Sequence, residues 1–298
     1  MKDKIIKQTH SGDWRYGSDE DKGDEGWQGL CTIGAKQSPI DFPGKEEAKK
    51  SEDEVEPLAF FHYKEKVSTN LTNNGHTAGG LRSLYFLDQI HFHWDSEHTI
   101  DNKRFAMEVH LVHHNVEMGS FEKAITKARG LAVLGAFVTE TDKPNPVFEA
   151  LIDGMSQAKT AGAATVLKST FSAADLLPKN VANFYRYEGS LTTPPCLETV
   201  IWTVFDDMIS ISKEQIEKFR ELQTKEAGPM KFNYRPTQPL NEREVIWIST
   251  IRDVVDETST FEMQNNISAG DSCHGKDRMT LILVLSLTSY QLLRRILS

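Results

Sequence analysis

Seven of the ten histidines lie between residues 76 and 114, and this cluster is the strongest chemical signal in the 298-residue sequence. Residues 89–94 read Gln-Ile-His-Phe-His-Trp. Since side chains alternate between the two faces of a strand, His91 and His93 share one face with Gln89. Metal-bound histidines need a hydrogen-bond acceptor for their other ring nitrogen, so Gln89 is predicted to hold one of these rings.

A second strand, residues 105–112, places His110 on the face that also carries Glu108, the second predicted ring-holding acceptor. If this strand runs antiparallel to the first, His110 meets His91 and His93. Three neutral imidazoles leave one position of a tetrahedral Zn²⁺ ion open, as in catalytic zinc sites. The alternative is a set of ordinary surface histidines. A single histidine would favour that interpretation, but His-x-His on one strand followed by Glu-x-His on the next does not.

Short strands must position these histidines, and the composition favours a globular domain that can bury them. Hydrophobic residues make up 39% and charged residues 26%, and the net charge of −9 argues against binding nucleic acid. Three cysteines are too few for a disulfide scaffold or a cysteine-rich zinc module. Alternating or β-branched runs predict strands in the segments Leu81–Trp94, Arg104–His113, Leu131–Thr139 and Leu197–Phe205. An Asn-Pro start predicts a helix at Pro146–Gln157, and apolar residues at helical spacing after a serine cap predict one at Lys213–Gln223.

Motifs spread over residues 12–252 resemble the α-class carbonic anhydrases. They read Trp-Arg-Tyr-Gly (14–17), Gln-Ser-Pro-Ile (37–40), Asn-Asn-Gly-His (73–76), HFHW (91–94), Ser-Glu-His-Thr (96–99), EVHLVH (108–113), GLAVLGAF (130–137) and GSLTTPPC (189–196). The resemblance implies an α+β, β-dominated domain over residues 12–258. It consists of a large twisted, mostly antiparallel sheet with a few short peripheral helices. The implied activity is the zinc-dependent, reversible hydration of carbon dioxide to bicarbonate and a proton.

The resemblance also assigns roles to single residues. The three strand histidines match the zinc ligands. Thr192 matches the threonine that orients the attacking oxygen, Glu97 the buried carboxylate that accepts from that threonine, and His76 the proton shuttle. The carbon dioxide site matches Val112, Val133, Leu191, Val200 and Trp202, with Thr193 as a polar neighbour.

Secreted and membrane-anchored members of that family bridge the positions that match Cys31 and Cys196, so the resemblance implies a disulfide here. The alternative is two buried thiols in a cytosolic enzyme. Cys273 has no predicted partner. Asn70 and Asn266 begin Asn-x-Thr/Ser triplets and are candidate glycosylation sites in an extracellular protein.

The two ends carry the signals for location. Residues 1–11 contain no apolar run of the length that a secretory signal needs. Residues 259–278 form a polar linker that includes the small residues Ser268-Ala269-Gly270, and residues 279–298 form a hydrophobic tail. This order predicts a glycolipid anchor at the cell surface, although an anchor requires a translocated chain. The alternative is an amphipathic helix docked on the domain.

The sequence departs from the family pattern in two shortened segments, one directly after His76-Thr77-Ala78 and one reduced to Asp95. These gaps keep open a catalytically weak or inactive binding domain, although all three ligands, Glu97 and Thr192 are present. A zinc esterase is the other alternative, and the sequence lacks the His-Glu-x-x-His motif of zinc proteases. The expected partners are carbon dioxide, bicarbonate and water, with lipid-anchored attachment to a membrane.

Overall fold

The structure is a computed structural model. It describes residues 14–17, 24–51, 55, 57–66, 70–73, 78–79, 84–85, 87–225, 228–250 and 280–284. For residues 70–73, 78–79, 84–85 and 280–284 it describes the backbone only. Among the helices of these described ranges, none has the length and apolar character needed to cross a bilayer.

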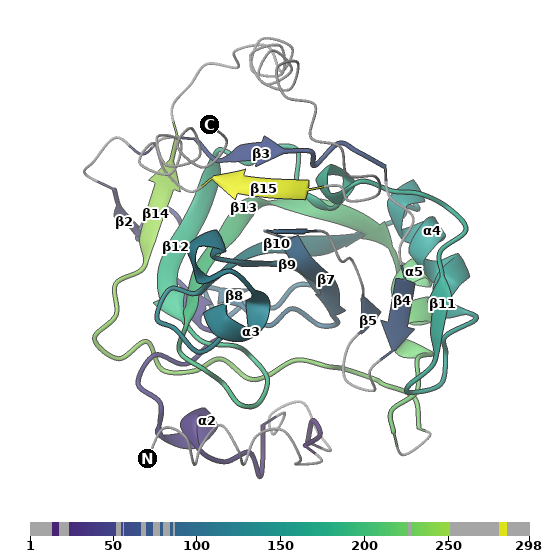
Figure 1. Ribbon diagram of the computed structural model, residues 1–298, viewed down its shortest axis with the longest axis horizontal. Helices are drawn as coiled ribbons and strands as arrows, with labels where there is room; N and C mark the ends of the chain where they lie inside the picture. The colour runs from purple at the N-terminus through teal and green to yellow at the C-terminus, as the bar shows by residue number, and fades with distance from the viewer. Residues whose placement is uncertain are drawn as a thin grey trace.

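One large sheet dominates the described part of the chain (Figure 1). Its ten strands are, in order, β11 (Ala164–Val166), β4 (Asn70–Asn73), β5 (Ala78–Gly79), β7 (Leu87–His93), β9 (Met107–His114), β10 (Leu131–Thr141), β13 (Val200–Ser212), β12 (Asn183–Gly189), β14 (Ile246–Ser249) and β2 (Lys49–Lys50). The pairs β10–β13 and β14–β2 are parallel, and the other neighbours are antiparallel. The predicted β-dominated class is confirmed.

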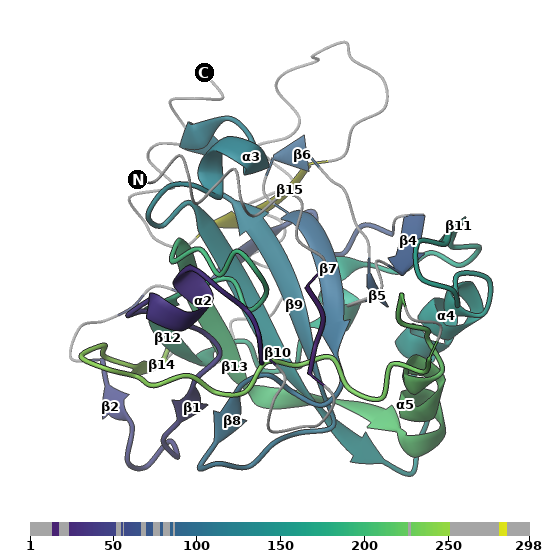
Figure 2. The same ribbon diagram turned by 90° about the horizontal axis from the view of Figure 1, so that it is seen from below.

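The helices are short and lie at the periphery. α4 (Pro146–Met155) and α5 (Lys213–Arg220) lie side by side at one edge of the sheet (Figures 1 and 2). α5 begins where Ser212 accepts from Gln215 N at 3.3 Å and Gln215 Oε1 accepts from Ser212 N at 3.2 Å, a reciprocal cap. Both helices end two or three residues before the predicted limits. The other helical segments are α2 (Leu30–Ile33), α3 (Phe121–Ala124) and 3₁₀ turns at Val116–Met118 and Ala173–Leu176.

Two smaller groups of strands lie outside the large sheet. β1 (Asp41–Phe42) pairs in parallel with β8 (Thr99–Ile100). β15 (Thr280–Val284) lies between β3 (Ala59–Phe61) and β6 (Leu84–Tyr85). β15 belongs to the segment predicted as an anchor signal, and residues 279 and 285–298 of that segment lie outside the described residues. The anchor therefore stays a prediction.

β9 separates two apolar clusters because its side chains alternate. Met107, Val109 and Leu111 are fully buried in the larger cluster, which includes residues of α4 and α5. Val112 belongs to the other cluster, with residues of β10 and β13. Every residue of β9 is buried. A strand covered on both faces is rigid, so it can position a polar site within one of its faces.

Candidate metal centre

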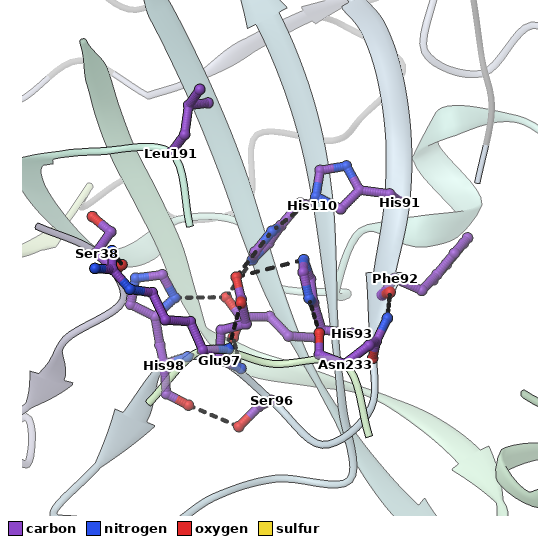
Figure 3. A network of polar contacts seen from close by, with 12 residues as sticks. Ser38, His91, Phe92, His93, Ser96, Glu97, His98, His110, Leu191 and Asn233 are labelled. Carbon is purple, nitrogen blue, oxygen red and sulfur yellow. Dashed lines mark hydrogen bonds and ion pairs between the residues drawn. The ribbon is translucent and has the colours of Figure 1, made fainter. Parts of the chain in front are cut away.

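The strands β7 and β9 bring three imidazoles together. The register pairs His91 with His110 in antiparallel strands, which is the arrangement that the sequence pattern required for the three histidines to meet. One nitrogen from each of His91, His93 and His110 lies within 4.8 Å of the others, and His91 Nε2 lies 3.3 Å from His110 Nδ1 (Figure 3). This convergence is the geometry that a single metal ion requires.

Hydrogen bonds decide which nitrogen of two of the rings faces the centre. His93 Nδ1 donates to the carbonyl of Asn233 at 2.7 Å, so its Nε2 points inward, where it is buried without a hydrogen-bond partner among the described residues. His110 Nε2 donates to Glu108 Oε1 at 2.8 Å, which leaves Nδ1 as the inward atom. Burial lowers the pKa of His93 to about 3, so this ring is neutral. Neutral imidazole nitrogens of this kind are the donors that Zn²⁺ prefers.

His91 is held less well than the other two rings. Burial, with the neighbouring His93 and His110, lowers its pKa well below the ordinary value. Its Nδ1 atom is buried and has no hydrogen-bond partner among the described residues. Gln89, which the sequence predicts to hold one of the ligand rings, has an exposed side chain. The structure therefore shows no hydrogen bond between Gln89 and His91 Nδ1, and the role of Gln89 stays a prediction.

Glu108 is a buried acceptor for four donors. Its Oε1 accepts from His110 Nε2 at 2.8 Å and from His98 Nδ1 at 2.7 Å. Its Oε2 accepts from the backbone N–H groups of Glu97 and His98 at 2.9 and 2.8 Å. Burial raises the pKa of Glu108, but the His98 and His110 rings outweigh burial and hold the pKa well below its usual range. Although His98, Glu108 and His110 also lie close enough to hold a metal, these donors already use both carboxylate oxygens.

The sequence reasoning missed His98 and the residues behind it. His98 Nε2 accepts from the Tyr187 hydroxyl at 2.7 Å, and that hydroxyl also contacts Ser38 Oγ at 2.8 Å. Ser38 and Ser190 exchange two backbone-to-hydroxyl bonds of 2.9 Å. The chain of contacts thus runs from the centre to the loop that carries Thr192. In the sequence, Ser38, His98 and Ser190 lie within the motifs at residues 37–40, 96–99 and 189–196.

Glu97 lies beside the inward nitrogens. Its Oε2 is 3.5 Å from His93 Nε2 and 3.9 Å from His110 Nδ1. Its Oε1 accepts from Arg235 N at 3.0 Å. Burial raises the pKa of Glu97 to about 7, opposed by the His110 ring and by a hydrogen bond with Thr192. A cation bound beside this carboxyl would favour its ionised form.

The shortened segment at Asp95 does not separate Glu97 from the histidines. Asp95 forms an ion pair with Arg220, with 3.1 Å between Asp95 Oδ1 and Arg220 Nη2.

The residues predicted to hold carbon dioxide gather in the apolar cluster next to the histidines. Trp202 is 2% exposed and its ring lies 4.8 Å from that of His110. Thr192 is buried, and Thr193 is half-buried with its carbonyl accepting from Cys196 N at 2.9 Å. The other members are Val112, Val133 and Val200, which are buried, and Leu191, which packs against them (Figure 3 shows Leu191).

Cys31 and Cys196 form a disulfide with Cα atoms 5.1 Å apart, which confirms the predicted pairing. Gln37 Nε2 donates to the carbonyl of Cys196 at 3.2 Å, and Arg235 donates to the carbonyl of Cys31 at 2.7 Å. The bridge therefore fixes the end of the loop that carries Thr192.

The side chains of three predicted site residues lie outside the described part of the structure. His76 and Asn266 lie outside the described residues. Asn70 begins β4 opposite Val166, and only its backbone is described. Their roles stay predictions.

The chain is similar in sequence to known carbonic anhydrases. The family model described as eukaryotic-type carbonic anhydrase matches residues 22–249. Mouse carbonic anhydrase 6 is 37% identical over 262 residues, which cover 80% of this chain and 81% of that protein. Mouse carbonic anhydrase 15 is 35% identical over 270 residues, which cover 79% of this chain and 83% of that protein.

Proposed function

Because this chain belongs to the eukaryotic-type carbonic anhydrases, we propose that it is an active zinc enzyme that hydrates carbon dioxide reversibly to bicarbonate and a proton. The observation that carries the proposal is the convergence of three imidazole nitrogens within 4.8 Å, with a buried Nε2 atom on His93 that has no hydrogen-bond partner among the described residues. His91, His93 and His110 would hold the ion. When bound, zinc supplies a Lewis acid that lets water act as a nucleophile near neutral pH.

Two residues orient the nucleophile in this proposal. An ionised carboxylate can only accept hydrogen bonds, so the Thr192 hydroxyl donates to Glu97. The Thr192 oxygen is then left to accept from the attacking water or hydroxide, which directs its remaining lone pair at the substrate. The hydrogen bond between Thr192 and Glu97 supports this arrangement.

The remaining steps belong to the apolar cluster and to His76. The wall formed by Val112, Val133, Val200, Leu191 and Trp202 offers carbon dioxide a site without competing polar groups. His76 accepts the proton that hydration releases, a task for which imidazole is suited by its pKa near 6.5.

We place the protein outside the cell. The disulfide is typical of oxidising compartments. Glycosylation at Asn70 and Asn266 and a glycolipid anchor signal at residues 279–298 belong to the same proposal.

The decisive experiment measures zinc content and stopped-flow carbon dioxide hydration on the full chain, with and without an aromatic sulfonamide. We expect equimolar zinc and hydration that the sulfonamide blocks. His93→Ala should lose both zinc and activity, while His62→Gln, an exposed histidine paired with Glu65 at 2.5 Å, should keep both. Bound zinc without sulfonamide-sensitive hydration would overturn the proposal.

A further inference from the structure

A carboxylate–imidazole pair lies at one end of the strands that carry the ligands. His114, the last residue of β9, has its Nδ1 atom 2.8 Å from Oδ2 of Asp88 on β7. Their side chains are 8% and 21% exposed. Burying such a pair in a sheet is costly unless it is hydrogen-bonded, and a buried titratable group with a specific charge partner is a candidate functional group.

The pair belongs to the face of β9 that forms the candidate site. Alternation places His114 on the same face as Val112 and His110, four residues away, at a Cα distance of about 13 Å along the strand. Asp88 sits where the register between β7 and β9 shifts, between Leu87 and Gln89. Such an irregularity re-aims a side chain, and here the carboxylate contacts His114.

The surroundings of Asp88 act on its carboxyl group. Burial raises the pKa of Asp88; the contact with His114 opposes this, and Glu122 of α3 adds to it. The neighbouring residue Phe121 packs against the same apolar cluster as Val112, so α3 borders both the site and the pair. His113, the preceding residue of β9, also interacts electrostatically with His114.

We propose that the Asp88–His114 pair is a second proton acceptor for the hydration reaction, working alongside His76. The inference rests on the proposed function. Each turnover converts carbon dioxide and water into bicarbonate and one proton. The pair of an ionised carboxylate and an imidazole takes up that proton, then passes it to a buffer base at the exposed edge of Asp88 and returns to its starting state.

The test uses His114→Gln and Asp88→Asn, each alone and combined with His76→Ala, in the zinc-loaded full chain. Oxygen-18 exchange in weak buffer separates the interconversion of carbon dioxide and bicarbonate from the proton-limited release of labelled water. In the His76→Ala background we expect each substitution to slow water release by roughly tenfold, less than the ~100-fold of a sole general base. Interconversion should stay unchanged, and added imidazole should restore water release.

A second readout does not depend on activity. In the ¹⁵N spectrum of the zinc-loaded protein, the His114 ring should show a protonation step that moves to lower pH in Asp88→Asn, because the ionised carboxylate favours the protonated ring. His62→Gln, from the exposed pair with Glu65, is the matched control and should change neither readout. Thermal unfolding verifies that the variants fold, and the similar size of Asn favours a folded Asp88 variant.

The outcomes separate the two proposals. Unchanged water release in the His76→Ala background, or a His114 ring that does not titrate, overturns the relay alone when the wild-type enzyme hydrates carbon dioxide normally. A zinc-loaded wild-type protein that does not hydrate carbon dioxide overturns the proposed function and the relay with it.

Discussion

His110 and His113 lie three residues apart on β9 and are both almost fully buried, yet their ring nitrogens have different hydrogen-bond partners. His113 uses both nitrogens, with Nδ1 donating to the Ala132 carbonyl at 3.2 Å and Nε2 accepting from the Tyr63 hydroxyl. In His110, Nε2 donates to the carboxylate of Glu108, and Nδ1 faces the two other histidines of the centre. A satisfied ring is structural, whereas a ring with one nitrogen aimed at other imidazoles is prepared for a metal.

The same comparison shows what makes a ligand well prepared. For both His93 and His110, a bond on the outer nitrogen selects the tautomer that presents the inner one. His91 has no such bond among the described residues. The centre therefore consists of two oriented rings and a third that the metal itself would have to orient.

The largest expected effect comes from removing the acceptor behind His110. Glu108→Gln keeps the shape but loses the negative charge, and it adds two donors where four donors already converge. We expect zinc affinity to fall by about 10- to 100-fold and the free energy of unfolding to fall by about 3 kcal/mol. Competition with a chelator and urea unfolding measure the two quantities.

Exposed Glu65 provides the matched control, since Glu65→Gln breaks a histidine–carboxylate pair that contacts no ligand. If Glu108→Gln binds zinc as tightly as the wild type, the orientation of His110 by its outer bond has no importance for the metal.

A smaller effect should appear on the structural side of the comparison. Burial lowers the pKa of His113 to about 4, whereas an unfolded histidine has a pKa near 6.5. Between these values the unfolded chain binds the additional proton, so stability falls as the pH drops from about 6.5 toward 4. This single histidine should remove about 2 kcal/mol of stability by about pH 5.

His113→Gln tests this contribution, because glutamine can still accept from Tyr63 but does not titrate. Urea unfolding at about pH 7.5 and about pH 5 should give a stability loss in the variant that is smaller by about 2 kcal/mol than in the wild type. His62→Gln, an exposed histidine, should keep the wild-type loss. Equal losses in His113→Gln and the wild type would show that His113 is protonated in the folded protein at acid pH.

Local patterns predicted the ligand strands, because alternation needs only neighbouring residues: it placed His91 and His93 on one face of one strand and His110 on one face of another, and the structure pairs these two strands. The groups that hold the rings were harder to predict. The carbonyl that accepts from His93 belongs to Asn233, which is 140 residues away, and any residue could supply it. The register shift next to Asp88 likewise has no signature in an alternating pattern. The sequence therefore predicts which side chains meet, while long-range backbone contacts decide how they are oriented.

The smallest expected effect concerns Gln89, and it tests whether His91 is the least supported ligand. Gln89 is exposed and is bonded to no ligand ring, so Gln89→Ala should change zinc affinity by less than about twofold, against the roughly 10- to 100-fold of a ring-holding residue. Chelator competition on Gln89→Ala and Glu108→Gln, measured side by side with the wild type, gives the difference in zinc affinity. A loss of tenfold or more in Gln89→Ala would mean that Gln89 bonds to His91 once zinc is bound. The three rings would then be equally supported, and the contrast between the oriented pair and the third ligand would disappear.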